Sequence, residues 1–285
     1  MTMLNSTDGA TGILPTEYAD LIVGPVTAEA VPFRTEVATT IRTASHEVRV
    51  PILREDAGAA WVREGEEINP DDPTLDELTI TPAKVAGLTI ISRELAEDSS
   101  PEAAELVGQS LARSIVAQVN AAFLTGLPAP APAGLPAATA TQITVSGADE
   151  AERANAYVYT LRNAVSQVRA HGGTPSAVLM NPADAFAMSA VTEAEGSRRF
   201  LMESAETVEG LPVIQSAAVP VGRAWVVDHA QVLTVLREGT TVAVSSDAYF
   251  SSDRVAVRAT MRVGFGFPAP ARLAVIALDG EPIAA

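Results

Sequence analysis

The stretch SPEAAELVGQSLARSIVAQVNAAFLT, residues 100–125, decides the fold because it predicts one long helix near the middle of the chain. Ser99 or Ser100 can cap its start, and Pro101 suits its first turn. A mostly apolar stripe recurs at helical spacing, consisting of Val107, Leu111, Ile115, Gln118 and Ala122, flanked by Leu106, Val119 and Phe123. A helix of roughly 24 residues is about 36 Å long. We therefore expect a spine against which both halves of the chain pack.

The composition is that of a globular protein with an acidic surface. Of the 285 residues, 47% are hydrophobic and 19% are charged, and the formal net charge is -16. This charge argues against a protein that tracks nucleic-acid phosphates. The chain has no cysteine, which excludes disulfides, thiolate zinc sites and cysteine nucleophiles. We identify no signal peptide and no apolar run long enough to span a bilayer.

Two segments before the helix cannot form cores of their own. Residues 1–45 form an arm that has a short helix beginning near Thr16, and it must lie on the rest of the chain or on a neighbour. Residues 46–92 predict a long two-stranded excursion with a turn at Asn69–Pro73. Its tip is acidic, with Glu64, Glu66, Glu67, Asp71, Asp72, Asp76 and Glu77. An isolated hairpin is marginal in water, so another surface must support it.

Alternating helices and strands after the linker at 127–141 predict a compact α/β unit. A helix is expected over 149–171, and Asn181 caps the next one with Pro182 at its first position. From residue 238 onward strands return. One of them alternates, with Val255, Val257, Ala259, Met261 and Val263 on one face and Arg254, Arg258, Thr260 and Arg262 mainly on the other. The run Gly264-Phe265-Gly266 indicates a bend or a close backbone approach.

Candidate sites are few. Asp228 and His229 could belong to a hydrolase, but neighbouring side chains on a strand point to opposite faces, and we favour structural roles. The acidic run Glu64–Glu77 could hold a divalent cation. We favour a solvated tip, or one that meets arginines of a neighbouring subunit, and the arginine face at 254–262 is a plausible complement. We assign no catalytic, cofactor-binding or metal residue and expect no enzyme activity.

The order of these segments resembles the major capsid protein family of tailed bacteriophages, the HK97-type fold. AAWVREGEEI and LTITPAKVAGLTIISRELAEDSS are similar to the extended loop that leads into the spine helix of that family. AVLMNPADAFAMSAV and EGLPVIQSAAVPVGRAWVVD resemble its axial domain. SSDAYFSSDRVAVRATMRVGFGFPAPARLAVI resembles its long peripheral strands.

The resemblance implies an α+β chain with five parts. These are an N-terminal arm at 1–45, an extended β-hairpin loop at 46–92, a peripheral domain with the spine helix at 93–145, an axial α/β domain at 146–237, and peripheral strands at 238–285 whose last strand returns to the axial domain.

The function implied is a major capsid protein that self-assembles as hexamers and pentamers into an icosahedral head around double-stranded DNA, without sequence-specific binding. The virion would be built in the host cytoplasm, with separate scaffolding, protease, portal and decoration proteins as possible partners and no membrane. An encapsulin-like compartment is the alternative on the same fold, and a soluble hydrolase is the alternative from another class.

Some members of that family weld their subunits through a lysine–asparagine isopeptide bond. The matching region near Glu77 has no lysine, and Lys84, the only lysine of the chain, lies toward the loop base. The promoting carboxylate would fall near Thr260 and Met261, neither of which is acidic. We therefore expect no cross-linking. There is also no room for a helical scaffolding segment before Thr16, so scaffolding is either separate or already removed.

Overall fold

The computed structural model describes residues 26–277, except 56, 60, 66, 68–70, 93–100, 139–140, 145–149 and 192–205. Helices are α3 (Pro101–Thr125), α4 (Glu150–Ala170) and α5 (Pro182–Ser189). Strands are β1 (Thr39–Thr43), β2 (Val48–Glu55), β3 (Thr74–Ile80), β4 (Ala83–Ser92), β5 (Thr141–Thr144), β6 (Ala177–Met180), β7 (Thr207–Val208), β8 (Leu211–Gln215), β9 (Arg223–Val227), β10 (Leu233–Tyr249), β11 (Arg254–Gly266) and β12 (Ala274–Ala277).

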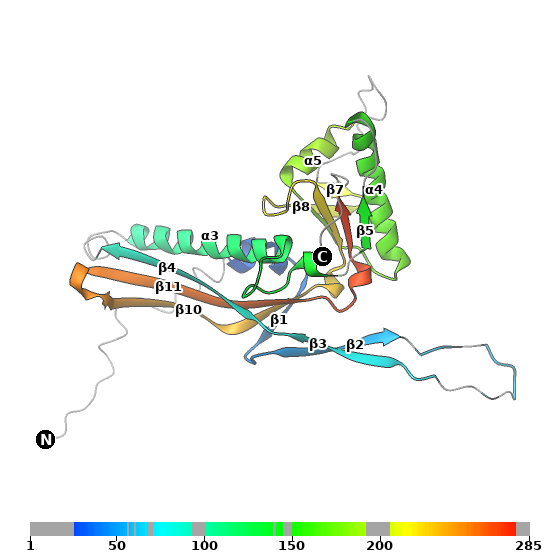
Figure 1. The fold of residues 1–285 in the computed structure, drawn as a ribbon, viewed down its shortest axis with the longest axis horizontal. Coiled ribbons are helices and arrows are strands. Elements are labelled where there is room, and N and C mark those ends of the chain that lie inside the picture. The colour runs from blue at the N-terminus through cyan, green and yellow to red at the C-terminus, as the bar shows by residue number, and fades with distance from the viewer. Residues whose placement is uncertain are drawn as a thin grey trace.

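Within the described residues the strands form two sheets and a separate ribbon. The long sheet has the order β1-β10-β11-β4, and the shorter strands form a sheet of order β5-β12-β9-β6-β8-β7. Strands β2 and β3 pair only with each other. Figure 1 shows α3 lying along one face of the long sheet, α4 and α5 beside the shorter sheet, and the ribbon extending away from both.

Helix α3 confirms the expected spine. Leu111, Ile115, Val119 and Phe123 are buried against the long sheet, and the rings of Phe123 and Phe265 lie 4.9 Å apart. The expected stripe is corrected at one position, because Gln118 is exposed and Val119 takes the buried place. Gly126, at φ +69°, follows the last helical residue in the left-handed conformation that glycine adopts readily. The expected cap at Ser99 or Ser100 lies outside the described residues.

The segment from Val26 to Thr43 lies on the chain's own body. Its buried apolar side chains, Val26, Ala30, Val31, Phe33, Val37 and Ala38, belong to the same core as α3. Strand β1 pairs in parallel with the start of β10. From the sequence, the arm was expected to lie either on the rest of the chain or on a neighbour. Residues 26–43 lie on the rest of the same chain. The short helix expected at Thr16 lies outside the described residues.

Strand β4 corrects the sequence interpretation of the excursion. Residues 83–92 were expected to belong to it, but β4 pairs antiparallel with β11 from Ser92↔Arg254 to Ala83↔Val263. The ribbon proper is therefore β2 with β3, in register from Val48↔Ile80 to Glu55↔Thr74. Pro82 separates β3 from β4, and proline cannot donate to a sheet ladder, which marks the point where the chain changes partner.

The shorter sheet confirms the expected α/β alternation. Asn181 caps α5, its Oδ1 accepting from the backbone N–H of Ala183 at 3.0 Å while its Nδ2 donates to the carbonyl of Val219 at 2.7 Å. Buried side chains of α4, including Leu161, Val165 and Val168, pack on the sheet. The other face of this sheet shares the core of α3, since Leu179 and Trp225 belong to that cluster.

Candidate assembly surfaces

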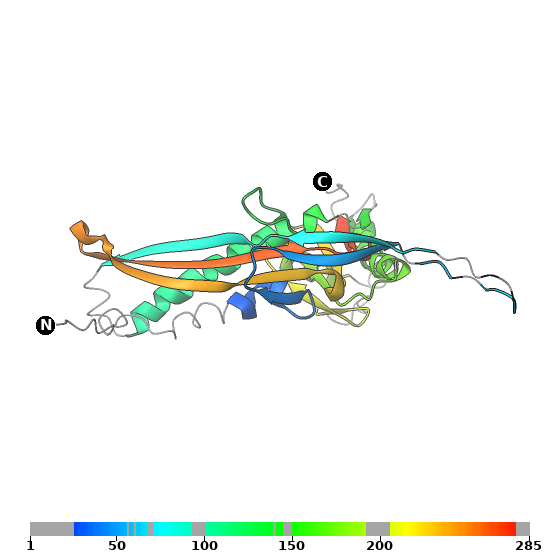
Figure 2. The same cartoon turned by 90° about the horizontal axis from the view of Figure 1, so that it is seen from below.

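The ribbon of β2 and β3 with the residues between them, 48–80, is called the extension here, and most of its described residues are exposed. Large apolar side chains stand in solvent along it: Trp61 is 105% exposed, Leu75 70% and Leu53 51%. In both views the extension projects beyond the body of the molecule (Figures 1 and 2). Contiguous exposed apolar surface on a soluble chain marks an interaction site.

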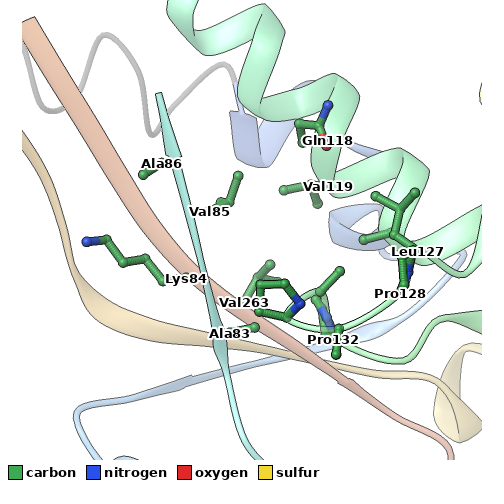
Figure 3. A pocket seen from close by; sticks show the side chains of 14 residues that line it. Ala83, Lys84, Val85, Ala86, Gln118, Val119, Leu127, Pro128, Pro132 and Val263 are labelled. Atoms are coloured by element: carbon green, nitrogen blue, oxygen red, sulfur yellow. The ribbon is translucent and has the colours of Figure 1, made fainter. Parts of the chain in front are cut away.

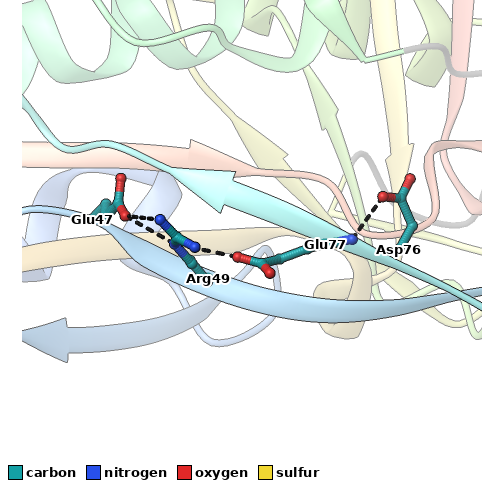
Figure 4. Close-up of polar contacts among 4 residues, drawn as sticks. All are labelled: Glu47, Arg49, Asp76 and Glu77. Atoms are coloured by element: carbon teal, nitrogen blue, oxygen red, sulfur yellow. Dashed lines mark hydrogen bonds and ion pairs between the residues drawn. The ribbon is translucent and has the colours of Figure 1, made fainter.

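Polar contacts along the extension hold its two strands in register. The guanidinium of Arg49 donates to Glu47 at 2.6 Å and lies 3.3 Å from a carboxylate oxygen of Glu77 (Figure 4). Arg54 pairs with Asp76 across the strands at 2.5 Å. The hydrogen bond from Arg49 to Glu47 raises the pKa of Arg49, and the nearby charge of the same carboxylate adds to the effect. These exposed pairs orient the ribbon more than they stabilise it.

The base of the extension is fixed to the long sheet by a small apolar cluster. Ile80 is 2% exposed and packs with Leu233 and Val235 of β10. Gly264 and Gly266 of β11 lie beneath it, and a Cβ at Gly266 would overlap the side chain of Ile80. This confirms the close backbone approach expected at Gly264-Phe265-Gly266. The sheet is therefore the support that the hairpin needs.

A row of cations crosses the face of the long sheet that points away from α3. Arg262 of β11 lies directly opposite Lys84 of β4 on one side and opposite Arg237 of β10 on the other. Directly opposed residues point to the same face of a sheet, so the three positive side chains stand in line. We call this set, with exposed Arg258 on the same face, the basic row. Figure 2 looks onto this face, with α3 behind the strands.

A groove lies on the opposite side of β4, between that strand, α3 and the loop Leu127–Pro132. Its volume is about 650 Å³. Figure 3 shows Val85, Val119 and Val263 around this space, whereas Lys84 points away from α3. Because β4 is the last strand of the long sheet, its outer edge borders the groove. Apart from Lys84 and Gln118 the lining residues are apolar, and they offer no cluster of chemically reactive groups.

The shorter sheet carries its own exposed apolar side chains. Tyr159 on α4, Phe186 on α5 and Val221 in the loop before β9 are all largely exposed. The loop is fixed from inside, since the backbone N–H of Gly222 donates to the buried Asp184 carboxylate at 2.9 Å. The loop that carries Val221 is therefore held against α5. Together the three exposed side chains form a second candidate contact surface.

Asp228 and His229 have structural partners. The buried Asp228 carboxylate accepts from the backbone N–H of Thr174 at 2.9 Å and from that of Ala230 at 3.1 Å, capping a short 3-10 turn at His229–Gln231. The backbone N–H of His229 donates to the hydroxyl of Ser176. The Asp228 carboxylate is thus engaged with the backbone, which suits the structural role favoured from the sequence.

Neither a metal-binding cluster nor a membrane-spanning helix is present in the part of the chain that the structure describes. There, no group of three or more His, Asp or Glu side chains is placed to hold a metal ion. No described helix combines the length and the apolar character needed to cross a bilayer. Of the acidic run, Glu66 lies outside the described residues, and Glu64, Glu67, Asp71 and Asp72 are exposed near the tip.

Sequence reasoning found the arginines of β11 but missed Lys84 and Arg237 as their neighbours. The register between two strands that lie far apart in the sequence cannot be predicted from the sequence of either strand alone. The available signal was weak: Lys84 holds the solvent-side position of an alternating strand, and Arg237 follows a run of buried residues.

Comparison with known proteins identifies a family for almost the whole chain. Residues 11–278 match the phage capsid family. A curated relative, the capsid polyprotein of Pseudomonas phage PAJU2, is 27% identical over 186 residues, which cover 63% of this chain and 28% of that protein. The chain thus matches little more than a quarter of the length of this relative.

Solved structures share the fold. A chain from Mycobacterium phage Adephagia superimposes with a TM-score of 0.72 at 18% identity, covering 87% of this chain and 90% of that one. A chain from Microbacterium phage Oxtober96 gives 0.72 at 16% identity, with 97% and 95% covered. A chain from the capsid of a native GTA particle gives 0.69 at 18% identity, also with 97% and 95% covered. The expected α+β, HK97-like fold class is confirmed.

Proposed function

The chain belongs to the phage capsid family, a family of viral shell proteins, and on this premise we propose that it is the major capsid subunit of a tailed phage. In this role it assembles as hexamers and pentamers into an icosahedral head that encloses double-stranded DNA. The observation that carries the proposal, beside family membership, is the extension. Its exposed Trp61, Leu75 and Leu53 have no cover within the described chain, and a shell of identical subunits supplies that cover.

The proposal also assigns a role to each part of the subunit. Apart from β5 and β12, which lie in the shorter sheet, residues 93–145 and 238–285 form a peripheral domain around α3 and the long strands, and residues 146–237 form an axial domain near the symmetry axes. The exposed Tyr159 and Phe186 favour contacts between copies of this axial unit. The arm at 1–45 and the part of the extended loop that precedes β4 connect neighbouring subunits, with the anchoring of Val26–Thr43 on the chain's own core as the fixed end of the arm.

The charge of the chain suits an enclosing wall. A formal net charge of -16 keeps the subunit from adhering to packaged polyanion, so DNA is held by enclosure and not by sequence-specific contact. We propose no enzymatic role, no cofactor and no membrane contact. The head is built in the host cytoplasm, and the partners that this role calls for are scaffolding, protease, portal and decoration proteins.

No finding favours either alternative function. The matched relatives are a phage capsid polyprotein and chains from phages and a capsid particle, which gives no support to an encapsulin-like compartment. A soluble hydrolase would need a free carboxylate beside its histidine, and Asp228 is instead bound by two backbone N–H groups.

The test is the size of the particles that the purified chain forms. Sedimentation velocity and negative-stain microscopy are expected to show capsomers or hollow shells whose amount rises with protein concentration. The variant Trp61→Ser is expected to keep the melting temperature of the subunit, because that side chain is fully exposed, and to form fewer particles. A compact monomer at every concentration would contradict the proposal.

A further inference from the structure

We propose that the outer edge of β4 binds an extended segment of a different protein, which adds a fifth strand to the four-stranded long sheet. The segment carries apolar side chains on one face, which enter the groove beside α3, and acidic side chains on the other face, which meet Lys84. The edge belongs to the single subunit, so this binding does not require shell assembly.

One edge of the β4 backbone has no partner strand. On its inner side β4 bonds to β11, and on its outer side it is the last strand of the long sheet. Among the described residues, no backbone group of Ala83–Ile91 bonds to a segment beyond that outer edge. An open strand edge is a template for pairing with a further strand. An extended polypeptide is the ligand whose backbone donors and acceptors repeat with the spacing of this edge.

The groove beside this edge has room for alternate side chains of the added strand. Val85 of β4, Val119 of α3 and the loop Leu127–Pro132 line it (Figure 3). Its volume of about 650 Å³ lies within the range of roughly 300–1,000 Å³ that is typical of ligand pockets. Successive side chains of a strand point to opposite faces, so every second residue of the partner enters the groove. These residues are apolar, because a polar group buried there without a hydrogen bond would cost free energy.

The opposite face of the same edge is positive. Lys84 points away from α3 (Figure 3), and Arg262 lies directly opposite it on β11. Neither side chain forms an ion pair or a hydrogen bond with a described residue. A carboxylate on the added strand, directly across from Lys84, would form a cross-strand pair of opposite charges. The partner segment therefore alternates apolar and acidic residues.

The strands of the extension lack this alternation, which favours a different protein over a second copy. In β3, Leu75 and Glu77 share one face while Asp76 and Leu78 share the other, so each face mixes apolar and acidic groups. Strand β2 contains Pro51, which cannot donate to a ladder. Nucleic acid offers phosphates to the cations but neither apolar side chains for the groove nor a strand backbone. A small apolar molecule would fill the groove and leave the strand edge unpaired.

The experiment measures binding of synthetic labelled peptides to the purified, unassembled chain by fluorescence anisotropy. The probe is the peptide TVEVEVEVT, and two comparison peptides replace its glutamates by lysine or its valines by asparagine. Two further peptides carry N-methyl groups on the valines alone or on the glutamates alone, which blocks one or the other edge of the strand. The variant is Lys84→Glu, and Arg113→Glu on the exposed side of α3 is the matched control. Melting temperatures verify that both variants fold.

The natural chain and the Arg113→Glu control are expected to bind the probe about tenfold more tightly than the lysine and asparagine peptides. Lys84→Glu is expected to reverse the preference between the glutamate and lysine peptides, because it reverses the charge across from the added strand. One methylated peptide is expected to lose binding about tenfold and the other to keep it, since one edge of the added strand pairs with β4. No saturable binding, equal effects of the two methylation patterns, or an unchanged preference in Lys84→Glu would overturn the inference.

Competition against the labelled probe separates the other occupants. Unlabelled peptides of residues 71–80 and 1–25 represent the extension and the arm, and a double-stranded DNA fragment represents nucleic acid. A competitor that displaces the probe more effectively than unlabelled TVEVEVEVT would assign the edge to that occupant and overturn the inference. Loss of peptide binding would leave the proposed shell function intact, whereas absence of particles would remove that function and leave the strand edge as a binding site.

Discussion

The backbone N–H of Val31 donates a hydrogen bond to Oδ1 of Asn120, 2.8 Å away, in the buried contact between the first described segment and α3. This single bond joins residues 89 positions apart. The bond fixes the segment that leads into β1 to helix α3. Because β1 is an edge strand of the long sheet, the bond also helps to hold that edge against α3.

Replacing Asn120 by Ala should therefore destabilise the subunit by about 1–3 kcal/mol, because the buried N–H of Val31 loses its acceptor. Chemical denaturation with fluorescence detection measures the free energy of unfolding. Arg113→Ala, an exposed change on the same helix, is the control and should stay within about 0.5 kcal/mol. Equal effects of the two substitutions would contradict the role assigned to Asn120.

Two glycines should respond in opposite directions to alanine. Gly266→Ala places a methyl group against buried Ile80 and half-buried Leu78 and should cost about 1–3 kcal/mol of stability, since overpacking forces neighbours to shift. Gly108→Ala in α3 meets nothing within 4 Å and should gain about 0.5–1 kcal/mol from the lower flexibility of the unfolded chain. Thermal melting of both variants checks the pair. A neutral Gly266→Ala would show that Ile80 does not hold the extension to the sheet.

The extension should loosen in acid. The backbone N–H of Glu77 lowers the pKa of the Asp76 carboxyl, and the Arg54 guanidinium adds to this shift. Because the folded pKa lies below the unfolded one, the stabilisation is present above the unfolded pKa and is lost as pH falls through the folded one. Amide hydrogen exchange of β2 and β3, taken relative to the intrinsic exchange rate at each pH, should show a loss of protection over that window.

The matched variant for this acid effect is Asp76→Asn, whose neutral side chain cannot titrate. The protection of its amides in β2 and β3, relative to the intrinsic exchange rate, should show no step over the same window. If the natural chain and Asp76→Asn lose protection together as the pH falls, the carboxyl of Asp76 is not the titrating group.

Assembled shells should contain no covalent links between subunits. The chain has one lysine, Lys84, and it lies on a sheet strand with Arg262 directly opposite, so no acidic group stands beside it across β11 to promote isopeptide formation. A denaturing gel of assembled particles should show one band at the 29.6 kDa of the monomer. A ladder of multiples that persists after boiling would contradict this.

The parts of the fold that depend on local pattern could be predicted from the sequence. The helix at 101–125 and the alternation around Met261 follow from periodicity within one element, and both are confirmed. The cap at Asn181 likewise depends on neighbours in sequence.

The parts that depend on distant partners could not be predicted. Strand β4 looks like a continuation of the hairpin, and only its pairing with β11 shows otherwise. Burial of Val31 under α3 depends on Asn120, a polar residue in a helix that offers no signal of its own. The alignment of Lys84 with Arg262 and Arg237 requires the register of three strands at once. Each depends on contacts between residues that lie far apart in the sequence.

The most direct test of the account is a cryo-electron microscopy map of assembled particles, traced through the extension from Val48 to Ile80. We predict that the exposed apolar side chains of the extension, Trp61 among them, lie against a neighbouring copy of the chain. A map in which each extension covers only its own subunit, or stands in solvent without a neighbour, would contradict the central claim that copies of this chain cover one another.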